Sequence, residues 1–469
     1  SGNPAALAGF PNGGGKSRLW TFPRSGFFHG PFYPQILLQS PIWETLPKRE
    51  QTVLRAMAET VKPDTVDEIA EYLGHEIRYD KVAKAIRALR ASNLVVIKCR
   101  ENAPDLLELH PLVRQFIRQH FSPRERVTFI DRIISIYLAV VGASRQQLSQ
   151  RPPLSILQRW SQIAELYIAA NKIQEAFAHL AEVADAFQSS PFSREFCRVT
   201  RMLLNRFDWI SDHYKFKFFE KVFAVNVNLL SHLGEYSEAE RLLGEFERTV
   251  PNRDARYIQY CGMQCEYHWI KGDFATAAQW GRTGKKLKDS GVDTRYEIAG
   301  TLALAERDSG HPEVALETFL QGQPLATVVN PASIDQERAG YYYGNIGRCL
   351  QFMGQTDSAL VCYRKSALLI ERRESGQTVL NQGYIRYWIG EVLLARGQRE
   401  LAKTFLLAAY AKWRHVSPPK AEKVRTLSEQ LGGVNARDHE AEERKAETVC
   451  LEWIYGQQVD ERVSSAAHL

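Results

Sequence analysis

The sequence predicts a mainly α-helical chain, in which a small domain of three helices and a β-hairpin precedes a right-handed solenoid of helical hairpins. Two observations carry this prediction. Through most of residues 41–415, apolar residues recur at intervals of three and four positions, which places them on one face of a helix. Between about residues 150 and 415 a helix-turn-helix pattern also recurs six times, and internal repeats of roughly 20–50 residues are typical of solenoids.

The composition limits the class of protein. The 469 residues are 44% hydrophobic and 24% charged, as is usual for soluble globular chains. No apolar run approaches the roughly 18 residues of a membrane-spanning helix, and the first residues do not form a secretion leader, so we expect a cytoplasmic protein with no membrane partner. The net charge of +6 permits an acidic partner without requiring nucleic acid. The seven scattered cysteines indicate reduced, mostly buried thiols.

Residues 1–40 are rich in glycine, proline, phenylalanine and tryptophan and have almost no helical period. We interpret them as the remnant of an upstream nucleotide-binding module and a connector, because they cannot form a core of their own. The run Gly15-Lys16-Ser17 has the letters that end a phosphate-binding loop, but five residues separate Gly9 from Gly15 where that loop has four. A surface loop is therefore the prediction for this run.

Residues 41–121 carry the pattern of a winged-helix domain. Three helices are predicted from the segments LPKREQTVLRAMAET, TVDEIAEYLG and RYDKVAKAIRALRASN, and Thr65 with Glu68 forms a capping box at the start of the second. The segments LVVIKC and DLLEL then flank the turn RENAPD, which is typical of a two-stranded wing. Three helices followed by a hairpin form one compact unit.

The third of these helices has two different faces. Val82, Ile86 and Leu89 form its core face. A basic third helix is the element that enters the major groove of DNA in domains of this kind. The alternative is that basic residues only solvate the exposed side of the helix, and no Asn or Gln base reader stands beside them. The candidate DNA contacts are Lys81, Lys84, Arg87 and Arg90.

Six helical hairpins follow in one register. The turn residue allows the first helix of each pair to end in a left-handed cap, and an alanine five positions later allows the two helices to approach closely. This register resembles the tetratricopeptide repeat, and residues 340–371 match its pattern throughout. The turn residues are Asn171, Gly234, Gly272, Gly310, Gly354 and Gly397. The alanines are Ala176, Ala239, Ala277, Ala315, Ala359 and Ala402.

The spacing of the turns sets the expected divisions of the chain. The step from Asn171 to Gly234 is too long for one repeat, so a degenerate pair is expected between 185 and 220. After about residue 415 the sequence turns polar, and a last helix at about 438–457 is expected to cap the stack before a frayed tail. The predicted divisions are a remnant with connector, a winged-helix domain, the solenoid, and a capping helix with tail, at residues 1–40, 41–121, 122–415 and 416–469.

A winged helix joined directly to tetratricopeptide repeats resembles the C-terminal half of a signal-transducing STAND NTPase of the NB-ARC type. The segment GNPAAL is similar to that family's G-x-P-x-A-L segment, whose proline lies beside the bound adenine, and this resemblance assigns the role to Pro4. The segment LHPLVRQFI is similar to the one that closes the family's winged helix, where a histidine contacts the β-phosphate of ADP. The matching residue is His110, although Pro111 stands where the family has an aspartate.

The resemblance implies that the full-length protein uses ATP and ADP. Its Walker A and B segments would lie before residue 1, so we expect no enzyme activity and no cofactor in this chain itself. No nucleophile elbow or other catalytic arrangement is recognisable. Cys261, Cys265 and His268 share one helical face, but no fourth ligand is evident and the repeat register assigns both cysteines to packing, so we predict no metal site.

The first helices of the repeats are expected to line a concave groove. Its register positions hold tyrosine, tryptophan and arginine, the residue types that carry most binding energy in protein interfaces. The alternative is that several of them pack between neighbouring repeats. The candidate partner-binding residues are Trp269, Arg307, Tyr341, Arg348, Gln351, Tyr384 and Tyr387. Further groove positions hold Gln259, Glu266 and Glu391.

These observations lead to three hypotheses. In the first, the chain is the sensor region of a STAND NTPase, in which the repeats bind a protein or small-molecule trigger and the winged helix couples that binding to an upstream nucleotide-binding domain. Proteins that resemble this arrangement include bacterial transcription activators and antiviral sensors, and we favour antiviral defence. In the second hypothesis the winged helix reads DNA and the repeats bind a ligand or partner. In the third the chain is a non-enzymatic scaffold.

Overall fold

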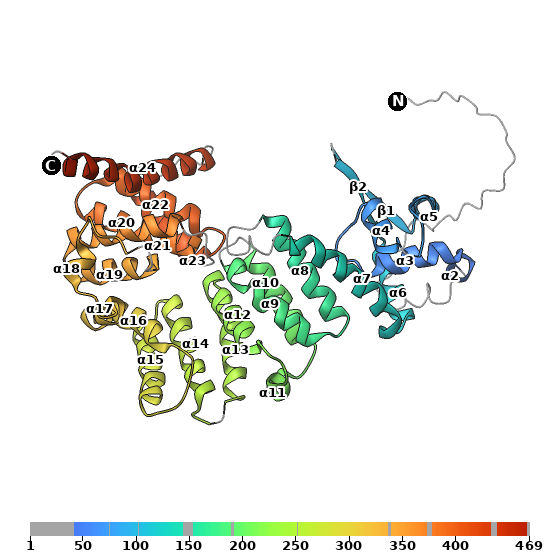
Figure 1. Ribbon diagram of the computed structural model, residues 1–469, viewed down its shortest axis with the longest axis horizontal. Helices are drawn as coiled ribbons and strands as arrows, with labels where there is room; N and C mark the ends of the chain where they lie inside the picture. The colour runs from blue at the N-terminus through green and yellow to red at the C-terminus, as the bar shows by residue number, and fades with distance from the viewer. Residues whose placement is uncertain are drawn as a thin grey trace, which may run out of the picture.

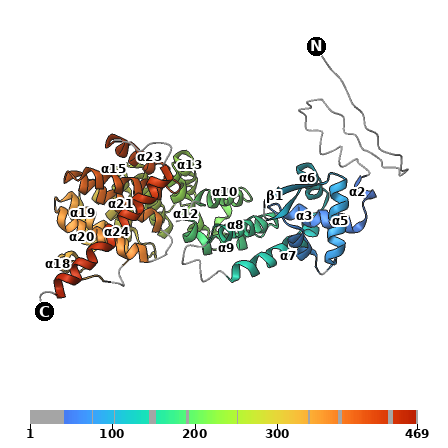
Figure 2. The ribbon, with the colours of Figure 1, turned by 90° about the horizontal axis from the view of Figure 1, so that it is seen from above.

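The chain forms an elongated and mainly helical structure, with a compact domain at one end and a curved stack of helices at the other (Figures 1 and 2). The connector predicted for residues 1–40 lies outside the described residues. The structure, a computed structural model, describes residues 42–74, 76–101, 103–143, 153–188, 192–250, 252–335, 339–372, 378–432 and 439–466.

Three helices and a β-hairpin make up most of the first domain. The two strands pair antiparallel, with Val95 opposite Leu109 and Ile97 opposite Leu107. An isolated bridge from Asp64 to Leu107 ties the hairpin to the segment between the first two long helices. The elements are α2 (Ile42–Thr45), α3 (Lys48–Glu59), α4 (Val66–Leu73), α5 (Tyr79–Ala91), β1 (Val95–Arg100) and β2 (Ala103–Leu109), followed by α6 (Pro111–His120) and α7 (Pro123–Gly142).

The local signals read from this part of the sequence are confirmed. The Thr65 hydroxyl accepts the Glu68 N–H at 3.2 Å, and the Glu68 carboxylate accepts the Thr65 N–H at 2.9 Å, which completes the capping box. Val82, Ile86 and Leu89 are at most 4% exposed. They join a core with α3, α4 and both strands. The helical period therefore identified the buried face of α5 correctly.

Helix α7 joins the first domain firmly to the stack. Arg126 of α7 donates to both carboxylate oxygens of Glu59 at 2.8 Å, and Glu59 is 1% exposed. The hydroxyls of Tyr137 in α7 and Tyr72 in α4 are 3.1 Å apart, and Tyr72 also donates to Asp64 at 2.9 Å. Further along, α7 packs against the first helix of the stack. A buried ion pair and a hydroxyl chain thus fix α7 to the domain before it.

The stack consists of helices that pack mainly on their neighbours along the chain. The pairs are α8 (Leu154–Ala169) with α9 (Ile173–Gln188), α10 (Ser193–Leu204) with α11 (Trp209–Asp212) and the short η2 (His213–Lys215), α12 (Phe219–Leu233) with α13 (Tyr236–Glu247), α14 (Ala255–Lys271) with α15 (Phe274–Asp289), α16 (Ile298–Asp308) with α17 (Pro312–Leu320), α19 (Gly340–Phe352) with α20 (Thr356–Arg372), and α21 (Thr378–Ala395) with α22 (Arg399–Trp413). Helices α18 (Leu325–Val329), α23 (Pro418–Gln430) and α24 (His439–Ala466) stand outside these pairs.

The register predicted for the repeats is confirmed at both of its marker positions. All six turn residues have the left-handed backbone conformation, with φ between 59° and 99°. All six alanines are fully buried, with an exposed fraction of 0%. A larger side chain at these positions would hold the two helices of a pair apart. The helical pairs are therefore tetratricopeptide-like.

Some elements differ from the expectation or refine it. The degenerate pair expected between 185 and 220 is α10 with the four-residue α11. The five-residue α18 lengthens the connection between α17 and α19. Helix α23 was not expected, because the sequence turns polar after about residue 415. The capping helix expected at about 438–457 is α24, which extends to Ala466.

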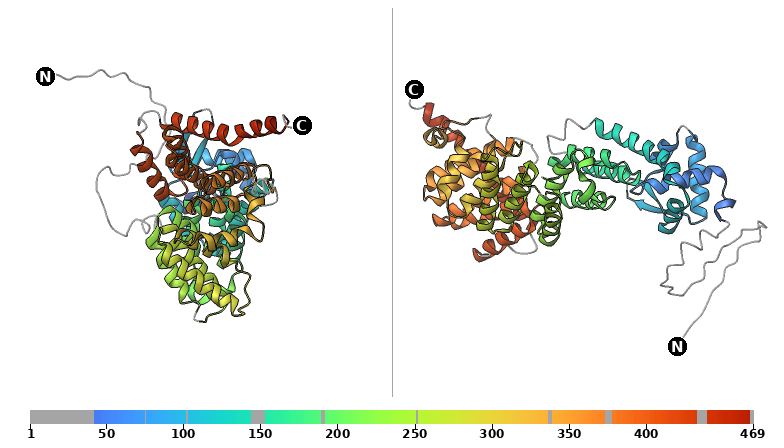
Figure 3. Two further views of the ribbon diagram at one scale, coloured as in Figure 1. Left: turned by 90° about the vertical axis from the view of Figure 1, so that its left-hand side faces the viewer. Right: turned by 90° about the horizontal axis from the view of Figure 1, so that it is seen from below.

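Helix α24 lies across the end of the stack (Figure 3). A buried arginine anchors it there. Arg386 of α21 is 0% exposed and pairs with Glu371 of α20 and Glu447 of α24, each at 2.8 Å. Cys450 and Ile454 of α24 are also fully buried. The helix therefore covers apolar surface of α20 and α22 and supplies a counterion for the arginine.

The stack curves so far that α23 returns to α12. Gly234, at the end of α12, has a φ of 81°, and a β-carbon placed on it would lie 2.9 Å from Cγ of Pro419. Glycine meets both requirements, since it tolerates a positive φ and has no β-carbon. This closure brings first helices from distant repeats to face a common interior.

Candidate ligand-binding cavity

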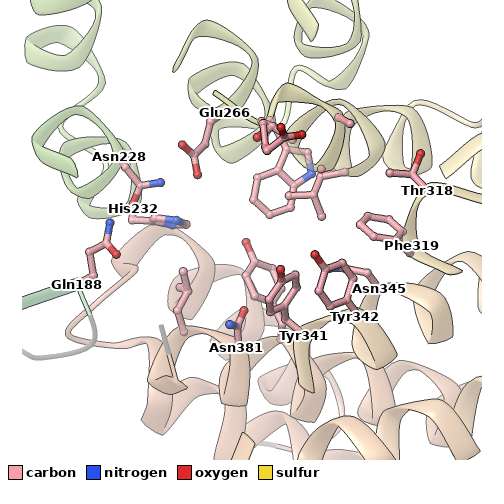
Figure 4. Close-up of a pocket in the computed structure, with 18 of the residues that line it drawn as sticks. Gln188, Asn228, His232, Glu266, Thr318, Phe319, Tyr341, Tyr342, Asn345 and Asn381 are labelled. Atoms are coloured by element: carbon pink, nitrogen blue, oxygen red, sulfur yellow. The ribbon is translucent and has the colours of Figure 1, made fainter. Parts of the chain in front are cut away.

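A cavity of about 610 Å³ lies inside the curve of the stack. Residues of α12, α14, α16, α17, α19 and α21 form its wall, together with Gln188 at the end of α9 and Val416 after α22. Figure 4 shows Asn228 and Glu266 on one side of this space and Tyr341 and Asn381 on the other. The site is therefore built by the curvature of the stack and not by any single repeat.

Aromatic side chains form much of the wall. The ring centroid of Tyr384 is 6.0 Å from that of Trp269 and 5.3 Å from that of Trp388. The rings of Tyr341 and Tyr342 are 4.2 Å apart, and Tyr341 is 42% exposed. Such faces attract apolar groups, other rings and cations. The aromatic residues of the wall are Trp269, Phe319, Tyr341, Tyr342, Tyr384 and Trp388.

The polar part of the wall is mostly uncharged. Its carboxylates are Glu266 and Glu297, and no lysine or arginine is among the described residues that line the cavity. Burial, and secondarily the nearby Lys420, lowers the pKa of His232 to about 3, so this imidazole is neutral. The uncharged polar residues of the wall are Gln188, Asn228, Thr301, Thr318, Gln321, Asn345 and Asn381.

Glu266 forms no ion pair within the described part of the chain. Burial in the wall raises the pKa of its carboxyl to about 7, and a hydrogen bond with Asn228 offsets part of that rise. Glu297 differs, because its carboxylate pairs with Lys288 at 2.7 Å and its side chain is 78% exposed. Near neutral pH, Glu266 therefore exchanges between the acid and the carboxylate, which is unusual for a glutamate.

A buried ionic network supports the aromatic wall. Arg307 is 2% exposed and donates to the Asp308 carboxylate at 2.9 and 2.6 Å. The indole N–H of Trp269 donates to the same carboxylate at 2.7 Å. Arg307 also donates to the side-chain oxygen of Asn345, and its guanidinium lies 5.3 Å from the Trp388 ring. These contacts fix the orientation of both tryptophans.

Arg348 belongs to this supporting network and not to the cavity wall. It pairs with the Glu391 carboxylate and donates to the Gln351 side chain at 3.0 Å. Its guanidinium lies 4.3 Å from the Phe352 ring and 5.7 Å from the Trp388 ring. Its polar and stacking contacts with α19 and α21 are therefore made inside the protein.

The structure divides the seven predicted groove residues into two groups. Trp269, Tyr341 and Tyr384 line the cavity, as does Glu266 at a further groove position. The others lie in the packing around it, and Tyr387, for example, is 8% exposed with its ring 5.8 Å from Trp413. The alternative, in which the side chain packs between neighbouring repeats, is the one observed for Arg307, Arg348, Gln351 and Tyr387.

Several wall residues were not among those predicted from the sequence. Asn228 and His232 lie on α12, the first helix of the repeat that turns at Gly234. The repeat register itself could have identified them, because they occupy groove positions of that repeat. Phe319 lies on α17, the second helix of its pair, and reaches the cavity only because of the curvature. Local sequence contains no signal for such a residue.

Lys420 of α23 lies close to the cavity without lining it. Its ammonium nitrogen is 5.6 Å from the centroid of the Trp269 ring and 5.3 Å from that of Tyr384. Burial lowers the pKa of Lys420 to about 8, against the opposing effect of Asp308. The helix that closes the curve therefore places a cation against two of the aromatic residues of the wall.

In the first domain, His110 begins α6. Its Nδ1 accepts the Leu112 N–H at 3.3 Å, so the side chain caps the helix, and the residue is exposed. Pro4, the other residue assigned to nucleotide sensing, lies outside the described residues. A nucleotide contact by His110 stays a prediction.

The basic residues of α5 are all exposed. Lys81 lies 3.9 Å from Asp80. The remaining three, Lys84, Arg87 and Arg90, form no ion pair with any described residue. They therefore present their charges to solvent, Lys84 and Arg87 on the side opposite the core face and Arg90 beside that face.

Three further observations concern the described residues as a whole. No group of three or more His, Cys, Asp or Glu side chains among them is arranged to hold a metal ion. Cys261 and Cys265 are fully buried, and His268 lies 3.4 Å from Asp273. Within the same residues, no helix is both long enough and apolar enough to cross a membrane.

Comparison with known proteins finds similar solved structures but no family model or curated protein. No protein-family model matches the sequence, and no curated protein is similar to it. A STAND protein with a tetratricopeptide repeat sensor from Pyrococcus horikoshii is similar at 13% identity and a TM-score of 0.30, over 93% of this chain and 67% of that one. A pentatricopeptide repeat protein from maize is similar at 15% identity and a TM-score of 0.20, over 89% of this chain and 64% of that one. Both TM-scores are low, so these similarities do not establish the fold. The helical-repeat architecture is inferred from the helices described above.

Proposed function

We propose that this chain is the sensor region of a larger signalling protein, and that the cavity of its helical stack binds a small-molecule trigger. The observation that carries the proposal is the cavity itself. Its volume of about 610 Å³ falls within the roughly 300–1,000 Å³ of ligand pockets, which are typically lined by aromatic groups with a few polar ones. A space of this size suits a small ligand better than a folded partner.

A ligand in the cavity would contact distant repeats at once. Asn228 of α12 and Tyr384 of α21 both line it, so an occupied cavity would favour the curvature in which these helices face each other. The core that contains α8 to α14 continues through α7 to Tyr72 of the first domain. A change in curvature would thus be transmitted to that domain through packed side chains.

The first domain has the element order of a winged helix, and on this proposal it passes the change to a nucleotide-binding domain upstream. The sequence resemblance to STAND NTPases supports this assignment. It implies that His110 contacts ADP in the full-length protein, and that the whole protein switches with ATP and ADP. A role in bacterial antiviral defence is the biological setting that we favour.

Filling the cavity tests the proposal. Gly300 of α16 lines it, and a β-carbon there would meet no atom within 4 Å. Gly300→Trp should therefore occupy the space without disturbing the helix and should abolish ligand binding in a thermal-shift screen of small molecules. Gly244 of α13 has equal room but lies outside the cavity, so Gly244→Trp is the matched control. Compounds that bind Gly300→Trp and Gly244→Trp equally well would show that the ligand binds outside the cavity.

The exposed basic face of α5 favours a second candidate function, DNA binding. Lys84 and Arg87 are exposed and form no ion pair within the described residues. If the domain binds duplex DNA, Lys84→Glu with Arg87→Glu should abolish a salt-dependent rise in fluorescence anisotropy of a labelled duplex. Absence of binding by the wild type at low salt would remove this candidate.

A further inference from the structure

We propose that the ligand of the cavity is a small protonated amine with an aromatic or apolar body, and that Glu266 is its counterion. This inference rests on the proposed function, since it names the chemical class of trigger that the same cavity would take. Three observations lead to it: the charges that line the cavity, the surroundings of Glu266, and the aromatic wall.

The charges of the wall are of one sign. Glu266 and Glu297 are its ionisable acids, and the described lining residues include no lysine or arginine. Glu297 is already paired with Lys288. His232 is neutral because burial lowers the pKa of its imidazole. An anionic ligand would therefore find no cationic donor among the described lining residues, whereas a cation would find one carboxylate that forms no ion pair with them.

Among the described residues, no cation stabilises the carboxylate of Glu266. Its hydrogen bond is with Asn228, a neutral amide. The titratable groups that interact electrostatically with it are Cys265, Tyr296 and Tyr384, and burial raises the pKa of each, so all three are uncharged at neutral pH. A buried carboxylate without a counterion is unfavourable. A ligand ammonium group beside Glu266 would remove this cost and bind the carboxylate at the same time.

The aromatic wall suits the rest of such a ligand. The faces of tryptophan and tyrosine attract cations electrostatically and also bury apolar surface. The protein itself uses this property, because Lys420 lies over the rings of Trp269 and Tyr384. Among the described residues no cation lies over Tyr341, which is 42% exposed and lines the cavity. Its ring therefore remains able to contact the ligand.

Two nearby positive charges do not change this conclusion. Arg307 is held by the Asp308 carboxylate at 2.6 Å, so its charge is balanced inside the network. Lys420 does not line the cavity, and burial lowers its pKa to about 8. Neither group offers a donor to an anion in the cavity. A neutral polyol could use the amides of the wall, but it would leave Glu266 without a counterion.

The experiment compares ligands of equal shape and different charge. Tryptamine, tryptophol and indole-3-acetate form one set, and phenethylamine, 2-phenylethanol and phenylacetate form another. Each is titrated into wild-type protein and into Glu266→Gln at about pH 8, by calorimetry and thermal shift. Glu317→Gln is the charge control, because Glu317 is exposed on α17 and does not line the cavity.

We expect the amines to bind most tightly. Glu266→Gln should weaken their affinity by about tenfold or more, whereas Glu317→Gln should leave it unchanged. Amine affinity for the wild type should also rise between about pH 6 and pH 8, as Glu266 ionises.

Equal affinity for tryptamine and tryptophol, or amine binding that survives Glu266→Gln, would overturn the inference. If neutral or acidic compounds bind instead and Gly300→Trp abolishes their binding, the cavity is still a ligand site and only the proposed ligand class is wrong. If no compound of any charge binds, the proposed function itself is contradicted, and the inference with it.

Discussion

The carboxyl of Glu266 binds a proton more tightly in the folded protein than in the unfolded chain. Burial raises its pKa from an ordinary value of 4.5 to about 7. Between these two pH values the folded state holds a proton that the unfolded chain has lost. The free energy of unfolding therefore falls as the pH rises through this window, and above it the penalty for the buried carboxylate is fully present.

We predict that Glu266→Gln raises the free energy of unfolding at about pH 8, by on the order of 3 kcal/mol, since glutamine has no charge to bury and can still accept from Asn228. The gain should disappear near pH 4, where the wild-type side chain is also neutral. Urea unfolding at several pH values measures both quantities. Glu317→Gln, an exposed control, should show no such trend, and equal stability of wild type and Glu266→Gln at every pH would contradict the raised pKa.

Each helical pair depends on two small residues, one at the turn and one on the second helix. Both could be located from the sequence, because the left-handed turn and the close helix contact impose steric limits that act over a few residues. Every predicted turn residue has a positive φ and every predicted alanine is fully buried, from Asn171 to Ala402. Local sterics therefore predicted how a pair is built.

Contacts between distant repeats could not be predicted in this way. Helix α23 starts at Pro418 and buries Ala421, Val424 and Ser428, whose spacing of three and four is helical, so the helix itself has a local signal that the polar composition of this stretch obscured. It packs mainly on α22, whereas its further contact with α12, which lies far away in the sequence, has no local signal. The same holds for the cavity, because the curvature of the stack decides which groove positions line it. Tyr384 and Tyr387 of the same helix both pack against Trp413, but only Tyr384 is among the described residues that line the cavity.

The alanine position gives a prediction at the scale of one helical pair. Ala315 is 0% exposed and Val314, beside it on α17, is 57% exposed. Ala315→Leu should lower the free energy of unfolding by about 1–3 kcal/mol, because the extra carbons must separate α17 from α16 or displace side chains. Val314→Leu adds a methylene to the same helix at an exposed position and should change stability by less than about 0.5 kcal/mol. Urea unfolding of both variants provides the comparison, and equal effects would contradict the close approach.

For the molecule as a whole, the contact between α23 and α12 decides whether the stack is an open curve or a closed one. It brings Lys420 against the rings of Trp269 and Tyr384 and keeps the repeats on both sides of the cavity in fixed positions. The cavity therefore depends on α23, although none of the described residues of that helix lines it. A substitution at that contact can change ligand binding from a distance.

Gly234 and Gly272 allow the effect of the contact between α23 and α12 to be tested apart from the effect of the left-handed turn. Both have a positive φ, of 81° and 94°, but a β-carbon on Gly234 would meet Pro419 of α23 whereas one on Gly272 would meet nothing within 4 Å. Alanine at either position should cost about 1–2 kcal/mol for the left-handed backbone. We predict that Gly234→Ala alone also displaces α23, so that hydrogen exchange in α23 becomes faster and the cavity binds its ligand more weakly. Equal exchange in α23 for the two variants would show that Pro419 adjusts to the new methyl group, and the closed curve would then not depend on Gly234.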